Sequence, residues 1–86
     1  MRKLTEQDLT TLIGTVQSGY TIRRARVKGG TFSDSDHYGI VLAECESESG
    51  LWVTWQFHLE DEKPSIYWGH YLESEETALA DYEARE

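Results

Sequence analysis

The stretch LWVTWQFHL, residues 51–59, decides the fold that we expect for this chain. Its residues fall into two alternating sets, and a period of two is typical of a β-strand with one buried face. We expect the first set to face the core, and it comprises Leu51, Val53, Trp55, Phe57 and Leu59. The second set points to the other face, and it comprises Trp52, Thr54, Gln56 and His58.

Three other segments have strand character and lie close to this one along the chain. Residues 38–46 precede it across a short polar loop that ends in Gly50, which predicts a β-hairpin. Residues 66–71 follow it after a turn at residues 60–64, and residues 20–28 form an earlier, basic strand that Gly29 and Gly30 interrupt. Short connections favour antiparallel pairing, so we expect a four-stranded antiparallel meander.

Helices are expected at both ends of the chain. Thr5 and Asp8 have the spacing of a capping box, and Leu4 and Leu9 have that of a hydrophobic staple. An apolar stripe at helical spacing then predicts a helix over residues 6–18, with Gly19 at its end; it consists of Leu9, Leu12, Ile13 and Val16. Ser74 is placed to cap a second helix that continues to about residue 84.

The expected fold class is therefore α+β, in the order helix, four strands, helix, within a single small domain over residues 1–86. We expect both helices to cover the face that bears Trp55 and Phe57. A domain of 86 residues has little room for a deep catalytic cleft, so the sequence favours action through the surface.

Charge is divided unevenly along the chain. Residues 1–30 carry a net charge of +4 and residues 31–86 a net charge of -12, which together give the total of -8. An acidic surface repels the phosphates of nucleic acids, so we expect a protein partner with a basic surface and no direct binding of nucleic acid. Solubility alone is an equally good explanation of the charge.

Localisation is expected to be cytoplasmic, without membrane contact. The longest apolar run, residues 38–43, is far shorter than the roughly 20 residues of a membrane span. The start of the chain leads into a polar helix and has no apolar signal core. The single cysteine, Cys45, is in keeping with a reducing compartment.

Strand register predicts an apolar patch on the outer face of the sheet. Pairing of Cys45 with Leu51 sets Val41 beside Trp55 inside and Glu44 beside Trp52 outside. Pairing of Leu59 with Ile66 sets Trp68 beside Phe57 inside and His58 beside Tyr67 outside. The expected outer face then comprises Tyr38, Ile40, Leu42, Trp52, His58, Tyr67 and Tyr71. Patches of this kind mark binding or self-association, including a possible homodimer. The alternative is a one-residue shift or a bulge in the strand over residues 38–46 that turns Ile40 and Leu42 inward.

Alternating carboxylates offer a second candidate surface. Glu44, Glu46 and Glu48 lie about 6.8 Å apart while the strand lasts, close to twice the step of phosphates along a DNA strand. Mimicry of DNA is one interpretation of this array, and an ordinary solvated surface is the other. The basic residues of segment 20–28 can pair with this acidic strand or bind an anion.

We expect no catalytic, metal or cofactor site. Asp34 and Asp36 resemble the opening of a calcium loop, but Cys45 stands where the bidentate glutamate is required. Cys45 and the three histidines lack the close pairs of a zinc site. A nucleophilic set built on Cys45 has no supporting motif, so we expect a protein that is not an enzyme.

The segment YWGHYLESEETALADYEAR, residues 67–85, is an aromatic strand that leads into a capped acidic helix, and it resembles the ends of small phage and mobile-element proteins. In size and acidity the chain is similar to anti-CRISPR and anti-restriction inhibitors, which bind host defence proteins or imitate DNA. The resemblance implies a phage-type inhibitor in the host cytoplasm. The residues expected to bind the host protein are Trp52, Tyr38, His58, Tyr67, Tyr71, Glu44, Glu46 and Glu48. The alternative is a module that sequesters a nucleotide-like ligand, possibly at a dimer interface.

Overall fold

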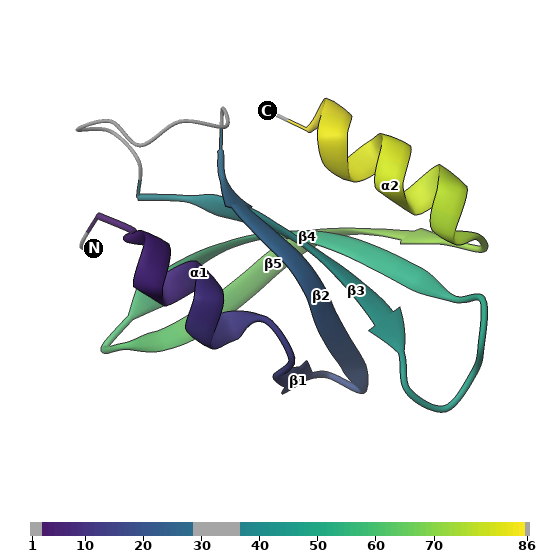
Figure 1. Ribbon diagram of the computed structural model, residues 1–86, viewed down its shortest axis with the longest axis horizontal. Helices are drawn as coiled ribbons and strands as arrows, with labels where there is room; N and C mark the ends of the chain where they lie inside the picture. Colours follow the sequence, from purple (N-terminus) through teal and green to yellow (C-terminus); the bar gives the residue numbers. More distant parts are fainter. Residues whose placement is uncertain (1–2, 29–36, 86) are drawn as a thin grey trace.

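The computed structural model describes residues 3–28 and 37–85 of the chain. They form a helix, five antiparallel strands and a second helix, in the sheet order β1-β2-β3-β4-β5 (Figure 1). The elements are α1 (Glu6–Leu12), β1 (Val16–Gln17), β2 (Tyr20–Val27), β3 (Gly39–Cys45), β4 (Trp52–Glu60), β5 (Lys63–Leu72) and α2 (Glu75–Ala84). The predicted α+β class with an antiparallel sheet is confirmed, but the predicted count of four strands is wrong because the structure has five.

Helix α1 begins as the sequence predicts and ends earlier. The Thr5 side chain accepts from the Asp8 backbone N–H at 3.2 Å, and Asp8 accepts from the Thr5 N–H at 2.7 Å, which completes the capping box. The helix stops at Leu12 because Ile13 is extended and Gly14 has φ +93°. The prediction of a helix to residue 18 is therefore wrong.

The chain after α1 forms the strand that the sequence analysis missed. Val16 and Gln17 pair with Thr21 and Tyr20 across a two-residue turn. Both turn residues, Ser18 and Gly19, have positive φ, at 51° and 84°, as in a type I′ hairpin turn. Gly19 thus shapes a turn and does not end a helix. The predicted break at Gly29 and Gly30 lies outside the described residues.

The central hairpin follows the predicted register. Val41 pairs with Trp55 and Glu44 with Trp52, and the Cys45 N–H donates to the Leu51 carbonyl at 2.9 Å. Parity therefore places Ile40 and Leu42 on the face opposite Val41. The alternative of a one-residue shift or a bulge in β3 does not occur, since the pairing of β3 with β4 is continuous from Gly39 to Glu44.

The second hairpin has a different register from the predicted one. Its turn contains only Asp61 and Glu62, with φ 52° and 65°, so Glu60 pairs with Lys63 and Leu59 with Pro64. The predicted pairing of Leu59 with Ile66 required a longer turn and is wrong. Further along, Trp55 is opposed by two residues, Trp68 and Gly69, which form a β-bulge.

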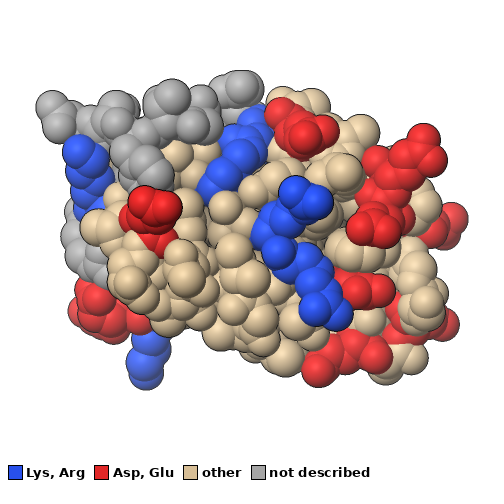
Figure 2. Space-filling model, in the orientation of Figure 1, with Lys and Arg blue, Asp and Glu red and all other residues tan. Residues whose placement is uncertain are grey.

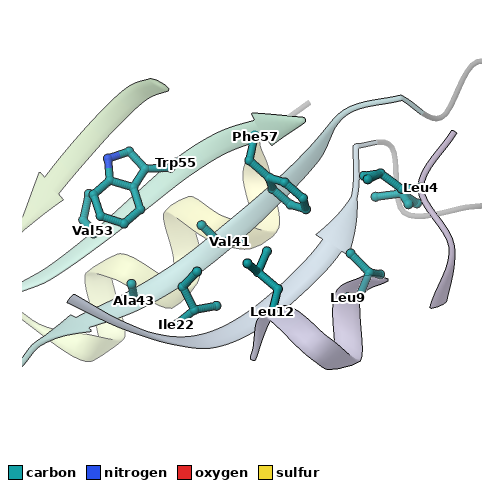
Figure 3. Close-up of a cluster of buried hydrophobic side chains, with 10 residues drawn as sticks. Leu4, Leu9, Leu12, Ile22, Val41, Ala43, Val53, Trp55 and Phe57 are labelled. Atoms are coloured by element: carbon teal, nitrogen blue, oxygen red, sulfur yellow. The ribbon is translucent and has the colours of Figure 1, made fainter. Parts of the chain in front are cut away.

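The larger core lies between α1 and the concave side of the sheet. Leu12 points from α1 toward Ile22 and Val41, and Leu9 and Phe57 lie in the same cluster (Figure 3). Leu4 joins this core beside Leu9, as the staple spacing predicts. The sidedness predicted for Trp55 and Phe57 is confirmed, since both are buried here.

Helix α2 covers the opposite face of the sheet (Figure 1). Ser74 caps it as predicted by accepting from the Thr77 N–H at 3.1 Å. Its buried residues Ala78 and Tyr82 pack in one cluster with Ile40, Leu42 and Trp52. The prediction that both helices cover the Trp55 face is therefore wrong, because the apolar residues of the second face are covered by this helix.

Candidate functional site

Trp52 is not the exposed anchor that strand parity predicts. Its side chain points to the expected face, since Trp52 pairs with Glu44, but only 7% of its surface is exposed. Ala78 and Tyr82 of α2 cover the Trp52 side chain, which packs in one cluster with Ile40 and Leu42 of β3. The centre of the expected outer patch is thus a second core.

Tyr71 lies on the other face from the one predicted. The bulge at Trp68 and Gly69 shifts the later part of β5, so that Tyr71 pairs with Val53. Its ring meets the rings of Tyr20 and Trp55 edge-on, at centroid distances of 6.1 and 6.5 Å, and remains 64% exposed. Tyr71 therefore does not share a surface with Tyr67 and His58.

The remaining predicted aromatic residues do come together. Tyr38, His58, Tyr67 and Trp68 form a continuous series of ring contacts, which we call the aromatic row. The ring centroids are 6.1 Å apart for Tyr38 and His58, 5.5 Å for His58 and Tyr67, and 5.1 Å for Tyr67 and Trp68. Offset and edge contacts of this kind stabilise aromatic clusters.

Polar contacts fix the middle of the aromatic row. The buried Gln56 donates from Nε2 to the Tyr67 hydroxyl at 3.3 Å, and His58 Nδ1 lies 3.3 Å from the same hydroxyl. His58 Nε2 is 3.9 Å from a carboxylate oxygen of Glu60. These partners hold two rings in place and leave Trp68 at the open end of the row.

Trp68 has the most unusual conformation of any aromatic residue in the described part of the chain. Its φ is +54°, which costs a bulky residue about 1–3 kcal/mol, and 67% of its surface is exposed. Arg85 donates from a guanidinium nitrogen to the Trp68 carbonyl at 2.7 Å. A Cβ at Gly69 would lie 2.8 Å from Trp55 Nε1, so only glycine fits next to Trp68. The predicted placement of Trp68 beside Phe57 in the core is wrong, since Phe57 pairs with Ile66 and Trp68 is exposed. A glycine within a strand pattern is a signal for the bulge that causes this difference.

A polar network joins α2 to the sheet beside Trp68. The Thr54 hydroxyl donates to Asp81 at 2.5 Å, and His70 Nδ1 lies 2.9 Å from the same carboxylate oxygen. Arg85 donates to the Thr54 carbonyl at 2.9 Å. Partial burial disfavours the charged carboxylate, but hydrogen bonds from Thr54 and His70 and the charge of Arg85 outweigh it and lower the pKa of Asp81. Through these contacts Asp81 joins α2 to Thr54 of β4 and His70 of β5.

A second arginine holds the C-terminal end of α2. Arg26 of β2 donates to the carbonyl oxygens of Tyr82 and Arg85, both at 2.6 Å. Its guanidinium also lies 5.2 Å from the centroid of the Tyr82 ring. Carbonyls at a helix C-terminus have no partners within the helix, and a cation there also complements the helix dipole.

The three alternating glutamates do not form a straight array. Strand β3 ends at Cys45, so Glu46 and Glu48 lie exposed in the following loop. Glu44 pairs with Arg23, whose nitrogens are 3.3 Å from its carboxylate, in line with the predicted pairing between the basic and acidic strands. Figure 2 shows basic side chains across the middle of one face and acidic ones around its right-hand side. Because β3 ends at Cys45, the three glutamates do not keep the regular spacing that would match DNA phosphates.

The residues considered for metal or nucleophilic chemistry are dispersed. Within residues 3–28 and 37–85, no group of three His, Cys, Asp or Glu side chains is placed to hold a metal ion. Asp34 and Asp36 lie outside the described residues. The Cys45 sulfur is 3.6 Å from the Ser47 hydroxyl, and this hydrogen bond lowers the pKa of the thiol.

One shallow hollow contains two arginines. It has a volume of about 450 Å³ and is lined by Arg23, Arg24, Leu42, Trp52, Glu44 and Glu75. Two carboxylates accompany the two guanidinium groups, so the hollow has no net positive charge to attract a phosphate.

No protein-family model, curated protein or solved structure is significantly similar to this chain. In the part of the chain that the structure describes, no helix combines the length and apolar character needed to cross a membrane.

Proposed function

We propose that this protein is a non-enzymatic, phage-type inhibitor that binds a host defence protein through the aromatic row. The observation that carries the proposal is Trp68, which is exposed and has a positive φ, with its carbonyl bound by Arg85. A strained residue of this kind costs free energy that the rest of the fold must compensate. Such residues are found most often at functional sites. Tryptophan is also enriched among the residues that dominate binding energy at protein interfaces.

Acidic side chains near the aromatic row favour a partner with a basic surface. Glu60 and Asp61 are exposed at the tip of the β4–β5 hairpin, next to His58. The net charge of -8 adds a long-range attraction that speeds encounter with a basic protein. Glu46 and Glu48 contribute to this attraction from the loop between β3 and β4. Mimicry of DNA by Glu44, Glu46 and Glu48 has less support, because the three do not continue one strand.

Binding of a nucleotide-like ligand is a weaker alternative. Arg23, which would have to hold the phosphate, already pairs with Glu44. Trp52, which would have to stack on the base, is covered by α2.

Affinity capture from a bacterial host lysate, followed by binding measurements with the purified partner, tests the proposal. Trp68→Asn removes the ring and suits a positive φ, because asparagine tolerates this backbone conformation. We expect Trp68→Asn to raise Kd by about 30-fold or more, which corresponds to about 2 kcal/mol. The partner's activity should fall when wild-type protein is added and should be restored by the same substitution.

Tyr71→Asn is the matched control. Tyr71 is 64% exposed and Trp68 67%, but Tyr71 contacts Tyr20 and Trp55 on the other face. Melting curves of both variants must show folded protein. Equal binding by wild type and Trp68→Asn would contradict the proposed contact surface, and capture of a partner whose activity is unaffected would contradict inhibition.

A further inference from the structure

One edge of the sheet is long and has no neighbouring strand within the described residues. It belongs to β5, which has ten residues and is the last strand in the sheet order. The opposite edge is formed by β1, which has only two residues. The chain before β1 also covers part of β2, since the Ile22 N–H donates to the Thr15 carbonyl at 2.9 Å and the Ile22 carbonyl accepts from the Gly14 N–H at 2.7 Å. The β5 edge is therefore the place where a further strand can add to this sheet.

Strand alternation identifies the backbone groups on the β5 edge. Glu60 and Lys63 pair across the two-residue turn, and in such a hairpin this pair exchanges two hydrogen bonds. Every second residue after Lys63 then faces β4, so the N–H and carbonyl of Ile66 point to the outer edge. The bulge moves the alternation by one residue, and Tyr71 is the next regularly paired residue that faces outward. Both residues thus present a donor and an acceptor that no strand of the described chain binds.

Two features limit the length of the open edge. Pro64 has no N–H to offer, and Arg85 already binds the Trp68 carbonyl at the bulge, at 2.7 Å. Prolines and bulges protect edge strands from unspecific pairing, so the edge accepts a strand of only about five residues. Trp68 lies within this stretch and is 67% exposed, so a strand added here would pass beside the aromatic row.

Charge indicates what kind of strand fits the β5 edge. β5 contains one lysine and no carboxylate, although the chain has a net charge of -8. Exposed carboxylates lie beyond both of its ends, at Asp61 in the hairpin tip and at Glu73 and Glu76 around the start of α2. A second copy of the chain, paired in either direction, would bring its own acidic ends against these carboxylates, and like charges repel. A strand of another protein with basic residues at both ends would complement them.

We propose that β5 binds an extended segment of a partner protein by strand addition, and that this segment is basic at both ends. The inference rests on the proposed function, because the segment belongs to the protein that contacts Trp68. It specifies how that protein binds. Hydrogen bonds to the backbones of Ile66 and Tyr71 supply affinity, and the Trp68 ring and the acidic ends of the edge select the partner.

Titration of the isotopically labelled chain with a synthetic peptide, followed by NMR, tests strand addition without the host protein. The probe is acetyl-Lys-Arg-Val-Thr-Val-Thr-Val-Arg-Lys-amide. We expect slower hydrogen exchange at the amides of Ile66 and Tyr71, which gain a partner, and no change at Tyr67, which faces β4. Absence of binding, or binding that leaves the two edge amides unprotected, would overturn the proposal.

Two control peptides separate backbone pairing from charge. A peptide with the same side chains but N-methylated valines and threonines cannot pair as a strand and should bind about tenfold more weakly, as expected for loss of two hydrogen bonds. A peptide with glutamate in place of lysine and arginine should bind about fivefold more weakly at low salt. Equal binding of the first control would overturn strand addition, and equal binding of the second would overturn the basic partner. Sedimentation of the free chain as a dimer that protects the same amides would assign the edge to a second copy.

A matched pair of variants tests the edge on the chain itself. Tyr71→Pro removes the outward N–H, and proline is tolerated at an outward position of an edge strand. We expect it to bind the probe about fivefold more weakly. Tyr71→Asn removes the same ring and keeps the N–H, so its affinity should stay within about twofold of wild type. Equal affinities of the two variants, with both shown to be folded by melting curves, would overturn the role of this amide. If Tyr71→Pro does not fold, the N-methylated peptide provides the same test on the wild-type chain.

These outcomes are distinguishable from those of the capture experiment. Failure of the peptide to bind removes strand addition and leaves the result for Trp68→Asn intact. Failure of capture through Trp68 removes the proposed function, and the peptide titration still measures a property of the chain itself.

Discussion

The N-terminal helix α1 covers one face of the sheet and the C-terminal helix α2 covers the other, and the two faces are stabilised in different ways. On the α1 face, Leu9 and Leu12 join a large apolar cluster with Phe57 and Trp55, and the cluster is almost free of polar groups. On the α2 face, a smaller apolar cluster around Trp52 is surrounded by hydrogen bonds from Arg26 and Arg85. Burial of apolar surface holds α1 on the sheet. Less apolar surface is buried under α2, and hydrogen bonds contribute the rest of its stabilisation.

This comparison predicts the largest loss of stability on the α1 face. Phe57 is 1% exposed, so Phe57→Ala removes a fully buried ring and should cost about 3–5 kcal/mol. That is a large share of the stability of a small domain, and most of the protein should be unfolded at 37 °C. Urea denaturation followed by circular dichroism measures it. A free energy of unfolding within about 1 kcal/mol of wild type would contradict the assignment of Phe57 to the main core.

A somewhat smaller loss is expected on the α2 face. Trp52→Ala should cost about 3 kcal/mol, because the ring is buried but its cluster is smaller. Trp68→Asn is the control, since a largely exposed tryptophan at positive φ should change stability by less than about 1 kcal/mol. Parallel urea titrations compare the two variants. Similar free energies of unfolding for Trp52→Ala and Trp68→Asn would mean that α2 does not cover Trp52.

The contribution of polar contacts to the α2 face is tested at Arg26. Arg26→Leu keeps much of the aliphatic volume and removes two hydrogen bonds to helix carbonyls, so we expect a loss of about 1–3 kcal/mol. Arg24 lies on the same strand and is exposed, and Arg24→Leu should change stability by about 0.5 kcal/mol or less. Hydrogen exchange of α2 amides should accelerate in the first variant only. Unchanged exchange would show that the apolar cluster alone holds the helix.

The smallest expected effect is a pH dependence confined to the α2 face. The folded pKa of Asp81 lies below its unfolded value, so its ionised form stabilises the fold above the unfolded pKa. This contribution is lost as the pH falls through the folded pKa. Asp81→Asn should therefore differ most from wild type near neutral pH and converge with it below about pH 4.

Melting temperatures measured from pH 7 to pH 2 test this dependence, with the exposed Glu76→Gln as the control. A constant difference between wild type and Asp81→Asn across this range would contradict the linkage.

Local sequence signals predicted much of the fold. The capping box at Thr5 and Asp8 and the N-cap at Ser74 depend on residues within one helical turn, and both are present. The register of β3 and β4 followed from the short loop between them, which sets Cys45 opposite Leu51. Residues 39–43 of β3 are buried on both faces, so the pattern of this strand alone left a one-residue shift open.

The errors arose where a short turn or a bulge changed the count of residues. Asp61 and Glu62 both adopt positive φ. Aspartate tolerates this conformation, but glycine is usual at the second position and Glu62 occupies it here, so the sequence did not mark a two-residue turn. The bulge at Trp68 and Gly69 then reversed the side on which Tyr71 lies. The candidate site was predicted only in part for this reason: Tyr38, His58 and Tyr67 come together, whereas Trp68 was expected in the core and is exposed.

The sequence by itself determined which way Trp52 and Trp55 point, because the direction of a side chain along a strand depends only on parity. It also determined that the Trp52 face is too apolar to be left in contact with water. Only the tertiary structure decided that α2, more than 20 residues further along the chain, covers this face and leaves Trp68 exposed at its edge. Whether this face is buried depends on where a distant helix packs. The apolar and polar contacts of the whole fold together determine that position.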